Sequence, residues 1–408
     1  MAAAPVHPVR LVVTDDLQRS RLTVFFRLLL VIPHLLWLGL FGIGVFFVAI
    51  VNWFATLFTG RAPKGIHDFL GGYLRYRTHV YGYLLLGANP YPKFYFGAPL
   101  EPYPVDLEID EPVRQNRWIT FFRLFLAFPA LAIAGILVGG TIQAFFLVLY
   151  SVTAVTAMFS WFSVLVRGRT PPGLRDVTAW SLGYRGRTMA YLWMLTDRYP
   201  NLGPVAMLRG TPVPPAPGRA QVINTDDLHR PRLTVFFRLL LAFPHLFWLE
   251  LWTIAALLAA IANWVVTLVL GRPARPLARF LSAYVRYNVH VSAFLYVVGG
   301  PFPGFVGKAG SYPVDLSIAP PGRQHRAVTL FKLVLMLPAA ILNGVLFYVL
   351  FIAAVFGWFA SLVRGRMPSG LQEAGAFSIG YTAQLNCYVF SLTDQYPHSS
   401  PLAVLAST

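Results

Sequence analysis

Paired carboxylates are the first candidates for chemistry in this sequence. Asp15 and Asp16 stand a few residues before Arg21, and the same pair recurs as Asp226 and Asp227. Two neighbouring carboxylates can act as general acid and base when a pocket holds a substrate between them. The sequence locates no such pocket, whereas an Asp just before a helix commonly caps it and pairs with a nearby arginine. We therefore predict helix capping and ion pairing at both places.

Histidine is the second candidate. His79 and His290 stand among Tyr and Arg residues, and neither has a second His or Cys at metal-ligand spacing. This setting favours packing at a membrane interface, or contact with a lipid phosphate, over metal binding. The sequence also lacks a phosphate-binding loop, a zinc-protease motif, a nucleophile elbow and a dinucleotide-binding motif. We expect no catalytic residue, no metal and no cofactor.

Basic residues are the most regularly placed charged groups. An arginine opens each of four apolar runs, a second base follows six residues later, and a proline follows six residues after that. Arginine and lysine at such boundaries extend their charged ends toward lipid headgroups. The candidate contacts with lipid phosphate or with the interface are Arg21, Arg27, Arg75, Arg117, Arg123, Arg232, Arg238, Arg326 and Lys332.

The composition predicts an integral membrane protein. The 408-residue chain is 56% hydrophobic, with a mean hydropathy of +0.59 and 12% charged residues, against about 25% charged in soluble domains. Its net charge of +17 is best explained by basic loops that stay in the cytoplasm. The expected partners are membrane lipids, mainly anionic, with a protein partner in the membrane left open and no nucleic acid. The single cysteine, Cys387, excludes an internal disulfide, and residues 1–9 do not resemble a cleaved signal peptide.

Four related units follow one another in the order A, B, A, B. The motif Thr14–Leu17 recurs 211 residues later at Thr225–Leu228, and Tyr103–Leu107 recurs 209 residues later at Tyr312–Leu316. A stretch rich in Pro and Gly separates two AB halves and reads as an exposed linker. The predicted domains are repeat A1 at 1–100, repeat B1 at 101–200, the linker at 201–220, repeat A2 at 221–309 and repeat B2 at 310–408.

Each apolar run is too long for one membrane crossing. The first, about 22–59, would reach roughly 57 Å as a helix, whereas the hydrocarbon core is about 30 Å thick. We therefore predict four transmembrane hairpins and about eight crossings. The other hairpins are expected at about 118–166, 233–270 and 327–363, and the turns at Gly39–Gly44, Gly139–Thr141, Glu250–Trp252 and Asn343–Gly344.

The ends of every run are basic and the predicted turns are not. The positive-inside rule then places both termini in the cytoplasm, for a multi-pass protein of the cell's inner (plasma) membrane. Glu250 is the one acid within an apolar run, and the sequence leaves open whether it lies in an outside turn or inside the membrane, where it would be a functional candidate.

The segments that flank the runs complete the predicted fold. Alternating apolar residues near Val9, Val105 and Val314, and more weakly near Val222, predict short cytoplasmic β-strands. After each run comes a second helical stretch, such as residues 69–81, whose Arg, His and Tyr content is typical of an amphipathic helix lying in the interface. The expected fold class is thus an all-α integral membrane protein with short strands and interfacial amphipathic helices.

The motifs resemble a known family. The order is Pro-Val-Asp-Leu-x-Ile, then Arg-x-x-x-Phe-Phe-Arg-Leu-x-Leu-x-x-Pro, then Arg-Gly-Arg-x-Pro-x-Gly-Leu. This pattern resembles an uncharacterised bacterial membrane-protein family, domain of unknown function 4389, in four tandem copies. The A units depart from it, since Arg10 replaces the strand Asp in the first. The resemblance implies the fold and a membrane location, and it brings no activity or catalytic residue.

Three classes of function fit these features. The preferred one is a non-catalytic scaffold or accessory subunit that organises lipid or partner membrane proteins. A transporter or channel built from parallel internal repeats is the alternative, and a polar tunnel between the halves would favour it. A lipid-modifying enzyme at the cytoplasmic interface is the third, and a cleft joining Asp15, Arg21, Arg75 and His79 would favour that.

Overall fold

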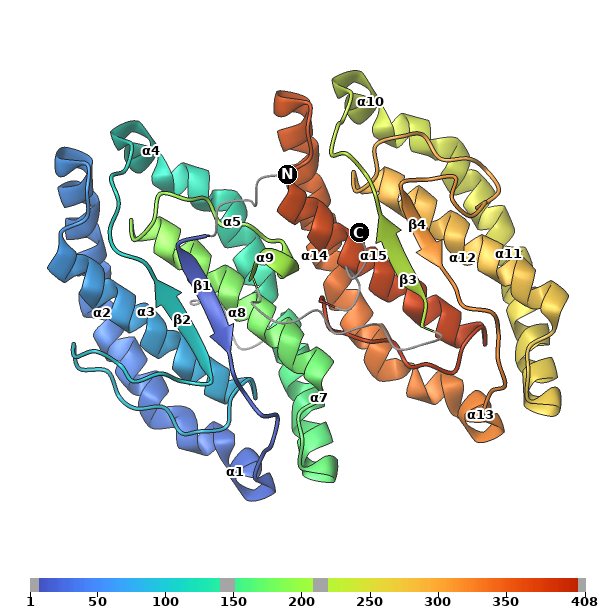
Figure 1. Cartoon of the computed structure of the whole chain (residues 1–408), viewed down its shortest axis with the longest axis horizontal. Coiled ribbons are helices and arrows are strands. Elements are labelled where there is room, and N and C mark those ends of the chain that lie inside the picture. Colours follow the sequence, from blue (N-terminus) through green and yellow to red (C-terminus); the bar gives the residue numbers. More distant parts are fainter. Residues whose placement is uncertain (1–6, 140–150, 208–218, 403–408) are drawn as a thin grey trace. The chain divides into compact units, whose positions relative to one another are not determined.

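The chain forms two compact units that repeat one arrangement of helices and strands. The structure is a computed structural model that describes residues 7–139, 151–207 and 219–402 (Figure 1). The two units are Met1–Thr211 and Pro212–Thr408, and each is described by itself. In both, each repeat consists of a strand, an apolar helical run and a second, more polar helix.

The elements of the first unit are β1 (Val9–Val13), α1 (Arg21–Phe25), α2 (Arg27–Thr59), α3 (Lys64–Leu84), β2 (Val105–Ile109), α4 (Arg117–Phe121), α5 (Arg123–Val138), α7 (Val152–Arg167), α8 (Pro172–Leu192) and α9 (Pro204–Met207). Those of the second unit are β3 (Gln221–Asn224), α10 (Arg232–Phe236), α11 (Arg238–Leu270), α12 (Arg275–Leu295), β4 (Val314–Ser317), α13 (Arg326–Leu335), α14 (Leu337–Arg364) and α15 (Ser369–Val389).

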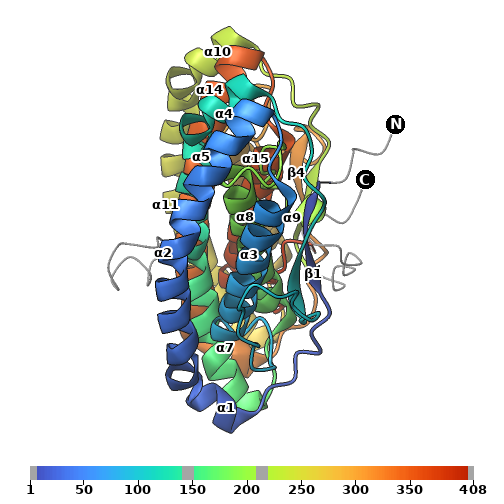
Figure 2. The ribbon, with the colours of Figure 1, turned by 90° about the vertical axis from the view of Figure 1, so that its left-hand side faces the viewer.

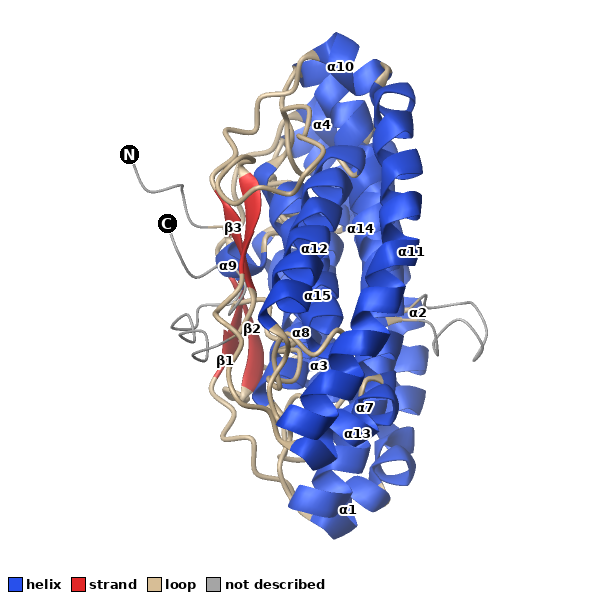
Figure 3. Ribbon diagram, turned by 90° about the vertical axis from the view of Figure 1, so that its right-hand side faces the viewer, coloured by secondary structure: helices blue, strands red, loops and turns tan. Residues whose placement is uncertain are grey.

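Each unit has three layers. In the first, α2 and α5 lie on one side of α3 and α8, and the strands lie on the other (Figure 2). The Tyr73 hydroxyl of α3 donates to the carbonyl of Leu38 in α2 at 3.0 Å, while Gly71 of α3 lies against Ile109 of β2. In the second, α11 and α14 are separated from the strands by α12 and α15 (Figure 3). We call the apolar helices α2, α5, α11 and α14 the apolar layer. The 21-residue helices α3, α8, α12 and α15 form the middle layer.

The predicted hairpins are wrong for three of the four runs. Helix α2 continues through Gly39–Gly44, α11 through Glu250–Trp252 and α14 through Asn343–Gly344. A turn in an apolar run leaves backbone N–H and C=O groups unpaired, whereas a continuous helix pairs them, and a glycine costs only about 1 kcal/mol in a helix. Within the described residues, three helices, α2, α11 and α14, are long and apolar enough to cross a membrane by length and composition. In the run 118–166, α5 ends at Val138, and residues 140 and 141 of the predicted turn lie outside the described residues.

The predicted strands are confirmed, and they pair within each unit. Strands β1 and β2 are antiparallel with Leu11 opposite Leu107, and β3 pairs with β4 with Val222 opposite Leu316. Each of the two described sheets therefore takes one strand from an A repeat and one from a B repeat. Even the weakly patterned copy around Val222 forms a strand.

The A and B repeats of a unit also complete each other's helix ends. The amide of Gln115 in B1 donates to the carbonyl of Gly60 at the end of α2, and the amide of Arg19 in A1 donates to Gly168 at the end of α7. The Asn52 side chain of α2 reaches across to the carbonyl of Trp193 at 2.8 Å. The second unit repeats the arrangement, since Gln324 donates to Gly271 and Arg230 to Gly365.

The helices predicted to lie in the membrane interface are instead the middle layer. A tyrosine at matching places in the four helices is buried: Tyr73, Tyr184, Tyr284 and Tyr381. A helix that has the apolar layer on one side and a sheet on the other exposes little surface to solvent. Its polar side chains therefore form hydrogen bonds with other groups of the same unit. The start of the predicted linker also packs, since Leu202 and Met207 are buried and Met207 lies against Gly183 of α8. Residues 208–218 of the linker lie outside the described residues.

Candidate membrane face

The outer surface of the apolar layer in the first unit is a continuous hydrocarbon face. Large side chains of α2 are exposed along its whole length, from Leu28 at 71% to Phe58 at 71%. Four polar residues of the same helix point the other way and are buried: Arg27, His34, Asn52 and Thr56. Thr59, the last residue of the helix, is exposed. His34 binds the Tyr76 hydroxyl at 2.7 Å. An exposed apolar surface of this extent marks contact with a membrane or a protein.

The second unit has the same face on α11. Leu239 and Ile254 are exposed, and the polar residues of the helix again point inward: Arg238, His245, Asn263 and Thr267. The exception is Glu250, which is exposed beside Phe247, Leu251 and Ile254. The alternative that Glu250 lies in a turn is therefore wrong, because the residue is inside a continuous helix.

The opposite side of the first unit is polar and charged. Arg10 of β1 forms ion pairs with Glu108 at 3.2 Å and Asp110 at 2.8 Å, and both acids are about half exposed. Lys93 and Glu101 form another exposed pair at 2.6 Å. The unit is thus amphipathic as a whole, with hydrocarbon on the helical side and charge on the sheet side.

The arginines that open the four runs lie at the ends of partner helices. Arg21 donates to the carbonyl of Val166, and Arg232 donates to Val363. Arg117 lies beside Gly60, and Arg326 lies beside Gly271. A cation is favoured there because a helix C-terminus carries partial negative charge. All four side chains remain exposed at the ends of the apolar layer, where the sequence places contacts with lipid phosphate.

The second base of each run is not available to lipid. Arg27, Arg123, Arg238 and Lys332 are 1–2% exposed. The three arginines donate to backbone carbonyls at the end of a middle-layer helix, as Arg238 does to Phe294 at 2.6 Å and Gly299 at 3.0 Å. Lys332 donates to the carbonyl of Thr393 and to the Gln324 side chain. Each of the four also lies over an aromatic ring, with 4.3–5.0 Å between the cation and the ring centroid. Their burial does not fit the predicted contact with lipid phosphate, because backbone carbonyls already occupy the charged ends.

Arg75, the remaining candidate, forms a network with His79 and Asp106. Arg75 Nη2 donates to Asp106 Oδ2 at 2.6 Å, and His79 Nε2 lies 2.7 Å from Oδ1. Burial by itself raises the pKa of Asp106, but hydrogen bonds from His79 and Arg75 outweigh it and lower the pKa to about 2. The second unit repeats the cluster with His290, Asp315 and Arg286. A carboxylate held ionised by two donors is a poor general base, because efficient bases have a pKa near the working pH.

A cavity of about 990 Å³ opens beside this network on the sheet side of the first unit. Its lining includes Arg75, Asp106 and Arg10. It does not include Asp15, which pairs with Arg19 at 2.7 Å, or Arg21, which lies at the end of α7. The cleft that would have favoured an enzyme is therefore not formed by the four residues named from the sequence. Among the described residues no group of three or more His, Cys, Asp or Glu side chains could hold a metal ion.

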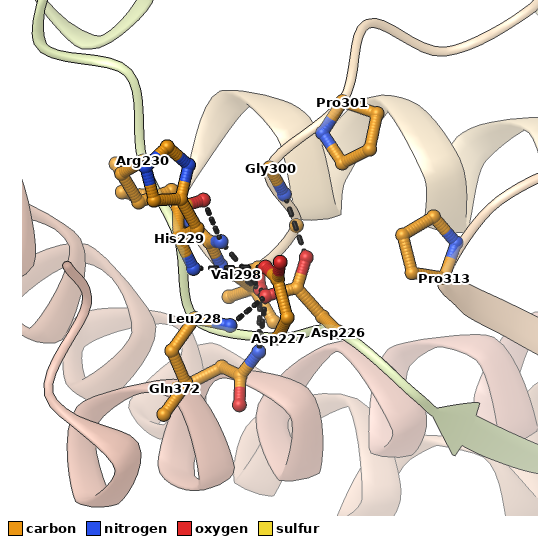
Figure 4. Close-up of polar contacts among 12 residues, drawn as sticks. Asp226, Asp227, Leu228, His229, Arg230, Val298, Gly300, Pro301, Pro313 and Gln372 are labelled. Atoms are coloured by element: carbon orange, nitrogen blue, oxygen red, sulfur yellow. Dashed lines mark hydrogen bonds and ion pairs between the residues drawn. The ribbon is translucent and has the colours of Figure 1, made fainter. Parts of the chain in front are cut away.

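The paired carboxylates form the predicted ion pairs, but the predicted helix capping is wrong. Asp15 pairs with Arg19 and Asp226 with Arg230, both at 2.7 Å, whereas α1 and α10 begin after Ser20 and Pro231 without a side-chain cap. The Asp226 side chain is buried. Its two oxygens accept hydrogen bonds from Arg230 at 2.7 Å, Gln372 at 3.0 Å and the amides of Leu228 and Gly300 at 2.9 Å (Figure 4). Asp226 thus joins the segment after β3 to the loop after α12 and to α15. Asp227 only accepts from the nearby amide of His229.

One cluster was not predicted from the sequence. Arg77 and Tyr81 of α3 and Arg185 of α8 lie together between the two helices, with the guanidinium carbons 5.7 and 5.1 Å from the Tyr81 ring centroid. Arg77 and Arg185 belong to different repeats, 108 residues apart, so spacing along the chain does not connect them. One signal in the sequence could have indicated the cluster. At the matching positions of the second unit the residues are uncharged, Asn288 and Thr382, so both arginines are specific to the first unit.

Comparison with known proteins agrees with the four repeats. The family model described as Domain of unknown function (DUF4389) matches residues 21–95, 117–202, 232–303 and 326–400. Searches of curated proteins and of solved structures found no match. Each match begins at the arginine that opens an apolar run, so the family pattern coincides with the repeating unit of the fold. The chain therefore belongs to the DUF4389 family, of which it carries four tandem copies.

Proposed function

We propose that this protein is a membrane scaffold whose units lie flat in one leaflet, with the apolar layer in the hydrocarbon and the sheet in water. The observation that supports this proposal is the continuous apolar face on α2 and α11. Arg, His, Asn and Thr side chains of both helices are buried on the opposite side. Helices that lie in the interface plane bury one face about 5–10 Å into the boundary of the acyl chains. Such a protein would organise the lipid beneath it or present its polar side to partner proteins.

The lengths of the helices favour the flat orientation over a crossing. Helix α2 has 33 residues, or roughly 50 Å, against a hydrocarbon core of about 30 Å. A crossing α2 would also carry α3 and the sheet to the same depth, because they run alongside it (Figure 2). Arg10, Glu108 and Asp110 would then lie near hydrocarbon, where each charge costs about 2.5–3.5 kcal/mol or more. In the flat orientation these residues remain in water.

The exposed arginines are consistent with the cytoplasmic leaflet. Arg21, Arg117, Arg232 and Arg326 lie at the ends of the apolar layer, at headgroup level in the flat orientation. Each basic residue near an anionic surface contributes about 1 kcal/mol of attraction. Both ends of the chain are then proposed to be cytoplasmic, at the inner (plasma) membrane, with anionic lipids as the main partners.

Spin labels on α2 distinguish the two orientations. Single cysteines at Leu29, Leu40 and Phe58, in a Cys387→Ser background, would be labelled in the full chain reconstituted into vesicles. Oxygen and a water-soluble nickel complex would then report the depth of each label. We expect all three labels at similar, shallow depth, and a label at Glu108 in water. A deep label at Leu40 with Leu29 and Phe58 near opposite surfaces would overturn the flat orientation in favour of a crossing.

Glu250 offers a second test on the same face. Its carboxylate opposes insertion of the surrounding part of α11, so Glu250→Leu should move a label at Ile254 deeper and reduce extraction by alkaline carbonate several-fold. Glu108→Leu, on the sheet side, is the matched control and should change neither. If Glu250→Leu left both readouts unchanged, this part of α11 would not lie in hydrocarbon.

A further inference from the structure

The cluster of Arg77, Tyr81 and Arg185 in the first unit holds two cations without an acid. Arg185 is 8% exposed, and neither arginine forms an ion pair with a carboxylate among the described residues. The segments outside the description, 1–6, 140–150, 208–218 and 403–408, contain no Asp or Glu in their sequence. The chain therefore supplies no ion-pair partner for two neighbouring guanidinium groups.

Two like charges held together under partial burial are unfavourable unless an anion compensates them. The electrostatics of the cluster agree with this. Burial, and then the charge of Arg77, lowers the pKa of Arg185 to about 10. Burial alone would raise the pKa of Tyr81, but the charges of Arg77 and Arg185 lower it. The lowered pKa of Tyr81 reflects the two positive charges beside it.

The cluster lies beneath the apolar layer. Tyr73 of α3, which interacts electrostatically with Arg77 and Arg185, donates its hydroxyl to Leu38 of α2. The pocket that contains the cluster is otherwise lined by Leu74, Thr78, Leu182, Gly186 and Met189. Its free volume is about 10 Å³, room for about one water-sized group. A ligand could place a single oxygen-sized group inside, and the rest of it would remain at the mouth.

The second unit shows that the fold does not require these charges. The positions that match Arg77, Tyr81 and Arg185 are Asn288, Ser292 and Thr382. They line a wider cavity of about 140 Å³, in which Thr382 donates to the Asn343 side chain at 2.7 Å. The same place in the fold is thus a neutral cavity of about 140 Å³ in the second unit and a doubly positive pocket of about 10 Å³ in the first.

We propose that Arg77, Tyr81 and Arg185 bind a phosphate-type oxyanion, supplied by a phospholipid headgroup or by inorganic phosphate. Guanidinium groups match phosphate oxygens with paired hydrogen bonds, and the Tyr81 hydroxyl adds a third donor. The lipid source rests on the proposed function, because it needs the apolar layer of this unit in a leaflet. The inorganic source does not.

The test compares the wild-type chain with a double variant, Arg77→Asn with Arg185→Thr, which copies the residues of the second unit. The thermal transition of each full chain in a neutral detergent is followed with sodium phosphate, with dihexanoylphosphatidylglycerol, and with sodium chloride at equal ionic strength. We expect phosphate, the lipid or both to raise the wild-type transition, and the midpoint concentration to rise at least tenfold in the variant. Arg114→Asn, at an exposed arginine, should respond like wild type.

The two probes identify the source of the anion. A response to the lipid alone assigns a headgroup, and a response to phosphate at comparable concentration assigns the free ion. Equal responses of wild type and variant, or no response beyond sodium chloride, would overturn the proposal. If the double variant fails to fold, as judged by circular dichroism, Arg77→Asn alone replaces it, because Arg77 is only partly buried. The spin-label depths on α2 are independent of this result, so failure of the anion site leaves the flat orientation standing.

Discussion

Replacing Asp226 by alanine is expected to destabilise the second unit by about 3–5 kcal/mol, the range for removing one partner of a buried ion pair. The side chains of Asp226 and Arg230 are 1% and 0% exposed, so the variant leaves a buried guanidinium without its carboxylate. The amide of Gly300 and the Gln372 side chain lose an acceptor at the same time. Because three segments meet at this carboxylate, the whole unit should loosen.

The measurement is thermal unfolding of the full chain, with hydrogen exchange to locate the change. At about 2–4 °C per kcal/mol for a unit of this size, the transition of the second unit should fall by roughly 10 °C. Peptides from α12 and α15 should exchange faster, whereas those from α3 and α8 serve as an internal reference. Asp227→Ala is the control and should cost less than about 1 kcal/mol, because Asp227 caps one exposed turn. Equal losses in the two variants would contradict the role assigned to Asp226.

Replacing Arg238 by methionine is expected to cost about 2–4 kcal/mol, since buried carbonyls left without a donor lose their full desolvation energy. The guanidinium donates to Phe294, Gly299 and Gly300, and methionine keeps the bulk of the side chain but none of these bonds. The C-terminus of α12 and the loop after it should become mobile first. Faster exchange in residues 294–300, measured by mass spectrometry, is the specific readout.

Arg238→Lys is the matched control. A lysine already occupies the equivalent position in another repeat of this chain, so the effect of the substitution can be inferred. In the fourth repeat Lys332 occupies this position and donates to Thr393 at 2.9 Å and to the Gln324 side chain at 2.7 Å. A lysine at 238 should therefore retain part of the contact and lose less than half of the stability that methionine loses. A methionine variant as stable as wild type would show that the carbonyls find other donors.

Features that depend on residues close together in the sequence, or on repeated motifs, could be predicted from the sequence. The strands at Val9, Val105 and Val314 follow from alternation, and the four repeats follow from motifs that recur at fixed offsets. Three of the four predicted hairpins are wrong because the length argument took every apolar run as perpendicular to the membrane. Gly39–Gly44 then had to be a turn, although glycine is also tolerated within a helix.

The polar contacts could not be predicted, because their acceptors lie far along the chain and are often backbone. Arg27 looked like a headgroup anchor, yet its acceptors are the carbonyls of Tyr83 and Ala88, which no side-chain pattern marks. The middle layer looked interfacial because its Arg, His and Tyr residues suit lipid headgroups. Its burial depends on a sheet formed by strands about 95 residues apart in sequence, such as Leu11 with Leu107.

The reciprocal contacts between A and B repeats bear on how this chain arose. One repeat supplies a single strand, and the end of its long helix is completed by the other repeat, at Gly60 by Gln115 and at Gly168 by Arg19. A polypeptide with one repeat would thus leave a strand edge unpaired and a helix end uncapped. Two identical single-repeat chains could supply each other with these contacts, and a chain of tandem repeats supplies them within one polypeptide. A living relative with a single copy should still be an obligate homodimer.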